Sequence, residues 1–152
     1  NVGLLAGAVT MLPAYSPACR PSTDRIETMS RVRVALTFEQ CWRESPGGTG
    51  VAAVELGRAL AARDDVEVIG VAGRHRRAAT AGYEPTVTVA QLPLAGPLLV
   101  ESSLRFGWPR IERATGPVDV LHATSIIPFA SAPHVPLVVT VLVSWNQVLS
   151  PK

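Results

Sequence analysis

The chain has 152 residues, of which 47% are hydrophobic and 17% are charged, and this composition excludes a chain that is disordered throughout. Its 14 basic and 12 acidic residues give a net charge of +2, which provides no argument for nucleic acid as a partner. The length suits one domain with a hydrophobic core of its own.

The two cysteines, Cys19 and Cys41, are too few and too widely separated for a disulfide framework or a metal site. They favour a reducing, cytoplasmic compartment. Cys41 has no neighbouring base in the sequence, which disfavours it as a nucleophile. No apolar run reaches the roughly 20 residues that a membrane-spanning helix needs.

The first 28 residues differ from the rest of the chain. They are apolar and rich in small residues, but they lack the basic start of a signal peptide. Met29 directly precedes a segment that is typical of the start of an α/β domain. We therefore expect residues 1–28 to be a disordered leader or upstream sequence, with a secretory signal as the alternative.

Predicted strands and helices alternate along the remaining chain. Apolar and β-branched runs predict strands, polar segments with helical periodicity predict helices, and Pro109 is expected to break the second helix or to start a short third one. The strands are predicted over 32–38, 66–71, 86–92, 118–122 and 137–143, and the helices over 51–63 and 98–113. In the first helix, Ala53, Leu56 and Leu60 form the expected buried face. The alternation predicts a Rossmann-like α/β domain with a doubly wound, mostly parallel sheet, which binds ligands beyond the carboxyl ends of its strands.

A glycine-rich turn at residues 45–50 joins the first predicted strand to the first predicted helix. Gly47 and Gly48 would expose backbone N–H groups at the positive end of the helix dipole, which suits a phosphate. Glycine has no Cβ to block the approach of a ligand. Thr49 is a candidate helix N-cap or a donor to phosphate.

Two well-known phosphate loops do not fit this turn. No Gly-Lys-Ser/Thr follows at Walker A spacing, and the glycines are too crowded for the dinucleotide fingerprint. No acidic residue ends the second predicted strand to hold a ribose, so a dehydrogenase is disfavoured. A purely structural turn stays open as an alternative.

Three segments in order resemble the N-terminal domain of the GT-B glycosyltransferases of family 4. The first is PGGTGVA at 46–52 with EL at 55–56 and RAL at 58–60, similar to the Gly-Gly turn and "EL-x-RAL" helix of the family. The second is VDVLHATS at 118–125, similar to "DVxHxxS", and the third is PLVVTV at 136–141, similar to "P-x-VVTxHD". The resemblance covers about residues 31–141 and departs after Val141, where the family continues with a His-Asp pair.

The resemblance implies transfer of a hexose from a nucleotide diphosphate sugar to a sugar or lipid-linked acceptor, with retention of configuration and with no metal or cofactor. The implied donor phosphate-binding residues are Gly47, Gly48 and Thr49. The implied catalytic residue is His122, and the implied acceptor-binding residues are Trp42, Thr124 and Ser125. Each of these residues also has a purely structural interpretation. The glycines would form a turn, Thr49 would cap the helix, and His122 would be a buried structural histidine. Thr124 and Ser125 would end a strand, and Trp42 would pack within a loop.

Other polar side chains carry weaker hypotheses. Glu39 and Glu44 follow the first strand and are candidates for acceptor hydroxyls or are solvated loop residues. The basic segment 74–77 is expected to be a solvated loop, with contact to phosphate or anionic lipid as the alternative. His75 and His134 are expected on surface loops.

The resemblance also implies a domain organisation. We expect the glycosyltransferase domain over 29–141, an atypical tail over 142–152, and a fragment that lacks the C-terminal GT-B domain and is inactive alone. The expected location is cytoplasmic, with peripheral contact to the inner face of the membrane left open. The alternative function is a stand-alone, non-enzymatic α/β domain that binds a nucleotide or a partner protein.

Overall fold

The computed structural model describes residues 31–126 and 129–142, so the predictions for residues 1–28 and for the tail beyond Leu142 lie outside the described residues. The described chain forms one five-stranded, all-parallel sheet in the order β3-β2-β1-β4-β5. The strands are β1 (Val32–Thr37), β2 (Val66–Ala72), β3 (Val89–Gln91), β4 (Val120–Ala123) and β5 (Leu137–Val139). The predicted α/β class and Rossmann-like sheet are thereby confirmed.

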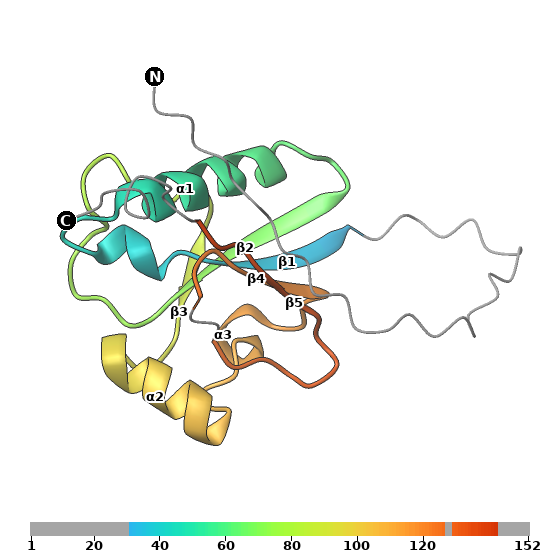
Figure 1. Cartoon of the computed structure of the whole chain (residues 1–152). Coiled ribbons are helices and arrows are strands. Elements are labelled where there is room, and N and C mark those ends of the chain that lie inside the picture. Colours follow the sequence, from blue (N-terminus) through green and yellow to red (C-terminus); the bar gives the residue numbers. More distant parts are fainter. Residues whose placement is uncertain (1–30, 127–128, 143–152) are drawn as a thin grey trace, which may run out of the picture.

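Helices cover both faces of this sheet (Figure 1). Helix α1 (Gly47–Ala61) lies on one face, and α2 (Gly96–Phe106) and α3 (Glu112–Thr115) lie on the other; a 3₁₀ helix, η1 (Glu39–Trp42), follows β1. Each face has its own buried cluster, one containing Leu36, Phe38 and Ala53 and the other containing Leu99 and Leu121. Alternation of side chains along each strand divides the core in this way, because successive residues point to opposite faces.

Both edge strands are shorter than the sequence predicted. β3 covers Val89–Gln91 instead of 86–92, and β5 covers Leu137–Val139 instead of 137–143. An edge strand can extend only along its single neighbour. β3 pairs with the last three residues of β2, and β5 pairs with the short β4. Tertiary pairing, rather than β-propensity, therefore sets the lengths of these two strands.

Helix α1 begins at Gly47, earlier than the predicted Val51, and this corrects the prediction that Thr49 is its N-cap. Thr49 lies in the first turn, where its hydroxyl donates to the carbonyl of Pro46 at 3.0 Å. The fully buried face also differs from the prediction, because Leu56 and Leu60 are only half-buried. The fully buried residues of this helix are smaller: Gly50, Ala53, Val54 and Gly57.

Close approach of α1 to the sheet explains this choice of small residues. A Cβ at Gly57 would lie 2.8 Å from Cζ of the buried Phe38. A Cβ at Gly70, on β2, would lie 3.1 Å from Cδ2 of the same ring. The Phe38 ring therefore occupies the space that two glycines leave open, and larger residues on this face would push α1 away from the sheet.

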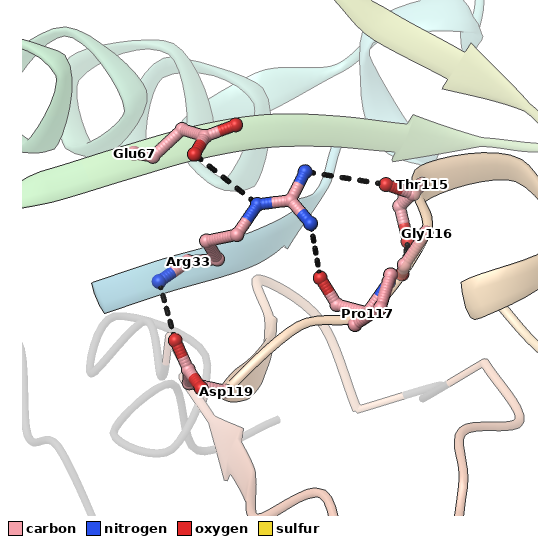
Figure 2. Close-up of polar contacts among 6 residues, drawn as sticks. All are labelled: Arg33, Glu67, Thr115, Gly116, Pro117 and Asp119. Carbon is pink, nitrogen blue, oxygen red and sulfur yellow. Dashed lines mark hydrogen bonds and ion pairs between the residues drawn. The ribbon is translucent and has the colours of Figure 1, made fainter. Parts of the chain in front are cut away.

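The amino end of the sheet is joined by Arg33 of β1 (Figure 2). Its guanidinium donates to Glu67 Oε2 on β2 at 3.1 Å and to the carbonyl oxygens of Thr115 and Pro117 in the turn before β4. The Arg33 backbone N–H donates to Asp119 Oδ2 at 2.8 Å, and the Asp119 N–H donates back to the Arg33 carbonyl at 2.9 Å. One side chain thus ties together three segments that are far apart in the sequence.

Candidate functional site

A cavity of about 550 Å³ opens at the carboxyl edge of the sheet. Its lining comes from the end of β1 and η1, from the loop after β2, from the first turns of α2 and from the segment after β4: Thr37, Glu39, Gln40, Trp42, Arg43, His75, Gly96, Pro97, Val100, Glu101, Ser125 and Phe129. The strand order reverses between β1 and β4, so this edge contains the crevice where parallel α/β sheets bind their ligands.

The base of the cavity is a buried polar network across the β1–β4 junction. The Thr124 N–H donates to Thr37 Oγ1 at 3.0 Å, and the Thr124 hydroxyl donates to the Thr37 carbonyl. The side-chain amide of Gln40, which is 1% exposed, donates to Thr124 Oγ1. These bonds satisfy backbone groups beyond the ends of the two strands, and they hold η1 against the segment that follows β4.

One acceptor in this network has no partner among the described residues. The amide oxygen Oε1 of Gln40 is buried and accepts no hydrogen bond. A buried carbonyl oxygen without a hydrogen bond destabilises the folded state. It is tolerated where other contacts of the same side chain hold it in place. In Gln40 the paired amide nitrogen fixes the side chain in place, next to the cavity.

One wall of the cavity is built from Glu39, His75 and Trp42. Glu39 Oε2 accepts the N–H of Gly73 at 2.7 Å and lies 3.1 Å from Nε2 of His75. The His75 ring stacks on Trp42 with a centroid distance of 4.6 Å and an interplanar angle of 6°. Trp42 Nε1 donates to the carbonyl of Arg77 at 2.9 Å. His75 lies on the predicted loop after β2, but its side chain is only 18% exposed and is held by these contacts.

Another part of the lining is the amino end of α2. Gly96 and Pro97 line the cavity, and the N-cap residue Ala95 offers no side chain to the free N–H groups of the first turn. Gly96 has a φ of 48°, and a Cβ there would meet no atom within 4 Å. Free N–H groups at a helix start attract negatively charged or strongly polar ligand atoms.

The predicted site residues divide into two groups. Trp42 and Ser125 line the cavity. Thr124 does not line it, but it is buried and hydrogen-bonded to the lining residues Thr37 and Gln40. Gly47, Gly48 and Thr49 are not among its lining residues. Gly47 and Gly48 are exposed at the start of α1, where a Cβ on either would meet nothing within 4 Å. The structure therefore separates the predicted acceptor residues from the predicted donor phosphate turn.

The side chain of His122 points to the opposite face of the sheet from those of its neighbours on β4, Leu121 and Ala123. It pairs in register with Leu36, whose side chain belongs to the cluster under α1. Its Nε2 lies 2.8 Å from Thr140 Oγ1, at hydrogen-bond distance. Burial lowers the pKa of the His122 imidazole, because the charged form loses solvation. The neutral ring is thus favoured.

Cys41 is fully buried in the cluster under α1. Burial raises the pKa of its thiol to about 11, because the thiolate would lose its solvation. The thiolate is the reactive form of cysteine, so this environment makes Cys41 inert. The structure agrees with the expectation that Cys41 is not a nucleophile.

Sequence reasoning missed Gln40, His75 and the start of α2 as parts of one site. Of the two carboxylates predicted as candidates for acceptor hydroxyls, Glu39 lines the cavity, whereas Glu44 is exposed and does not line it. A usable signal was present in Gly96-Pro97 after the third strand, because glycine and proline together often begin a helix. For His75 the signal was its position directly after a buried strand of a parallel sheet.

The fold and the site together define a Rossmann-like α/β domain with a ligand-sized cavity at the switch point of a parallel sheet. A scan against protein-family models, a search of curated proteins and a search of solved structures each gave no match. Within the described ranges, no group of three or more His, Cys, Asp or Glu side chains gathers as a metal site would require. No helix in the same ranges combines the length and apolarity needed to cross a bilayer.

Proposed function

We propose that this chain carries the N-terminal, acceptor-binding domain of a retaining GT-B glycosyltransferase of family 4, which transfers a hexose from a nucleotide diphosphate sugar. The observation that carries the proposal is the cavity at the β1–β4 crevice, which combines an aromatic side chain with a set of hydrogen-bonding groups. Its volume of about 550 Å³ falls within the range of small-molecule sites.

The lining residues suit a polyhydroxyl acceptor. Trp42 offers an apolar ring surface of the kind that packs against the C–H face of a sugar. Glu39 keeps acceptor capacity for ligand hydroxyl groups, because its contacts to Gly73 and His75 both involve one oxygen, Oε2. Ser125 adds a hydroxyl that both donates and accepts. In this proposal these three residues orient the acceptor.

The donor side of the proposal rests on the start of α1. Gly47 has a φ of 58°, and Gly48 follows it in the first turn, where no side chain caps the free N–H groups. These groups are open to a diphosphate that reaches them from another domain. The role of His122 in transfer stays a prediction, because His122 does not line the cavity and its ring is engaged by Thr140.

Calorimetric titration of the chain with UDP-glucose, GDP-mannose, free hexose and NAD tests the proposal. We expect weak binding of at least one nucleotide sugar and of the hexose, and no binding of NAD. In Glu39→Gln, hexose binding should weaken by about fivefold to tenfold, which corresponds to replacing one charge-assisted hydrogen bond by a neutral one. Glu44→Gln is the matched control, since that carboxylate is exposed and outside the cavity.

Three results would contradict this function. Tight binding of NAD would point to a redox domain. A nucleotide bound without any hexose would favour a stand-alone nucleotide-binding domain. Equal effects of Glu39→Gln and Glu44→Gln would place the sugar outside the cavity.

A further inference from the structure

Four arginines in or beside the segments that line the cavity have no carboxylate partner in the described part of the chain. Arg43 lines the cavity, and Arg74, Arg76 and Arg77 flank the lining residue His75. All four are exposed, and none forms an ion pair with the described residues. Five other basic side chains do form such pairs, whereas Arg31, Arg110 and Arg113 do not. The four arginines, called the arginine rim below, are therefore distinguished by their position in or beside the segments that line the cavity.

Hydrogen bonds hold the basic segment at the cavity. The Arg77 carbonyl accepts from Trp42 Nε1 at 2.9 Å, and the Arg74 N–H donates to the carbonyl of Leu94, just before α2, at 2.8 Å. Together with the stacking of His75 on Trp42, these bonds anchor both ends of the segment. The expected solvated loop is therefore a fixed part of the site, although its guanidinium groups remain exposed.

The carboxylates in the lining form no ion pair with these arginines. Glu39 is engaged by the Gly73 N–H and by His75, and Glu101 forms an ion pair with Arg105 at 2.7 Å. The uncapped amino end of α2 lies next to this segment, as the Arg74–Leu94 hydrogen bond shows, and it adds partial positive charge. The unpaired arginines and the helix end together favour a ligand with concentrated negative charge.

We propose that the cavity binds a ligand carrying a phosphomonoester group, held between the arginine rim and the amino end of α2. The inference rests on the proposed function in treating this ligand as the glycosyl acceptor, so it narrows the acceptor to a phosphorylated one. A phosphate dianion offers three acceptor oxygens, which match the forked donors of several guanidinium groups. Glu39, Trp42 and Ser125 then contact the sugar or polyol that carries the phosphate.

The test compares glucose 6-phosphate with glucose in calorimetric titrations of the full chain. We expect the phosphorylated sugar to bind about tenfold tighter or more, which corresponds to at least one charge-assisted hydrogen bond. The difference should shrink as salt is added, because the arginines are exposed. Arg43→Gln should remove most of the difference, and a combined Arg76→Gln and Arg77→Gln variant provides a second, independent test of the rim. The matched control is Arg113→Gln on α3, another exposed arginine that does not line the cavity.

A second arm identifies the source of the phosphate. Co-sedimentation with phosphatidylcholine vesicles, with and without phosphatidic acid, measures binding to a lipid phosphomonoester. Arg43-dependent binding to the phosphatidic acid vesicles without binding of glucose 6-phosphate would support a lipid-borne phosphate. Binding of the soluble sugar phosphate alone would support a free one.

The outcomes separate this inference from the proposed function. Equal affinities for glucose and glucose 6-phosphate, with no vesicle binding, would overturn the phosphate inference and leave a neutral acceptor in place. Binding of sugar phosphate without any nucleotide sugar would support the phosphate site and contradict the transferase. If neither the sugars nor the vesicles bind, both proposals are overturned. Equal losses of affinity in Arg43→Gln and Arg113→Gln would show that the arginines at the cavity do not bind the phosphate.

Discussion

His122 shows how position within the sheet sets the chemistry of a single residue. Its imidazole is half-buried on β4, and Thr140 is its hydrogen-bond partner. Because burial lowers the pKa of the ring, protonation of His122 is harder in the folded chain than in the unfolded chain. Acidification is therefore expected to destabilise the fold through His122.

We predict that His122→Gln reduces the loss of stability on acidification. The unfolded chain binds a proton at the ordinary histidine pKa of about 6.5, whereas the folded chain binds it only at lower pH. Stability is then complete above that value and falls as the pH drops through it. Urea unfolding from pH 7.5 to pH 5.5, about one unit to either side of that value, should show a smaller loss for His122→Gln than for the parent chain.

The control for this measurement is His134→Gln, because His134 is exposed on a loop and was predicted there. That variant should follow the pH dependence of the parent chain. Parallel losses in the parent and in His122→Gln would show that burial of the imidazole does not contribute to acid sensitivity.

At the scale of the element, α1 depends on its small residues more than on its leucines. Gly50, Ala53 and Gly57 are buried, and the Phe38 ring fills the space beneath Gly57. The period of the helix was readable in the sequence, but its leucines suggested a different buried face. Hydrophobicity alone cannot show that the axis of a helix lies too close to a sheet for large side chains.

We predict that Gly57→Ala destabilises the fold. The new methyl group would approach Phe38 at 2.8 Å, and that ring cannot retreat because it also faces Gly70. Overpacking costs about 1–3 kcal/mol, and the gain in helix propensity offsets about 1 kcal/mol of this. Thermal or urea unfolding should therefore give a net loss of up to about 2 kcal/mol.

Gly48→Ala on the same helix is the matched control, because a Cβ there meets nothing within 4 Å. It should be neutral or stabilising by up to about 1 kcal/mol. A Gly57→Ala variant as stable as Gly48→Ala would disprove the close contact between α1 and the sheet.

At the scale of the whole molecule, Arg33 joins parts of the chain that only the tertiary structure brings together. Its side chain, 31% exposed, contacts β2 and two carbonyl groups before β4 (Figure 2). We predict that Arg33→Lys destabilises the domain by about 1–2 kcal/mol, because a single ammonium cannot replace the forked guanidinium donors. Urea unfolding of the full chain measures this difference.

Arg58→Lys provides the comparison for this substitution. Arg58 pairs with Glu55 on the exposed side of α1 at 2.8 Å, and such surface pairs contribute about 0–1 kcal/mol. Its variant should lie within about 0.5 kcal/mol of the parent chain. Equal effects at positions 33 and 58 would mean that the carbonyl contacts of Arg33 contribute no stability.

The sequence by itself determined the alternation of strands and helices, the parallel α/β class and the presence of Trp42 and Ser125 at the edge where ligands bind. Local hydrophobic patterns carry this information, because burial on both faces leaves continuous apolar runs such as 32–38. The lengths of the edge strands and the buried face of α1 depended on their neighbours, and the sequence pattern did not predict them.

Only the tertiary structure decided which residues share the cavity. Glu39, His75, Gly96 and Ser125 come from four separate segments, and they meet because β4 lies beside β1 while β2 lies on its other side. Strand order depends on the global packing of the helices, which no local pattern records. The sequence therefore pointed to the start of α1 as the ligand site, whereas the fold places the start of α2 at the cavity.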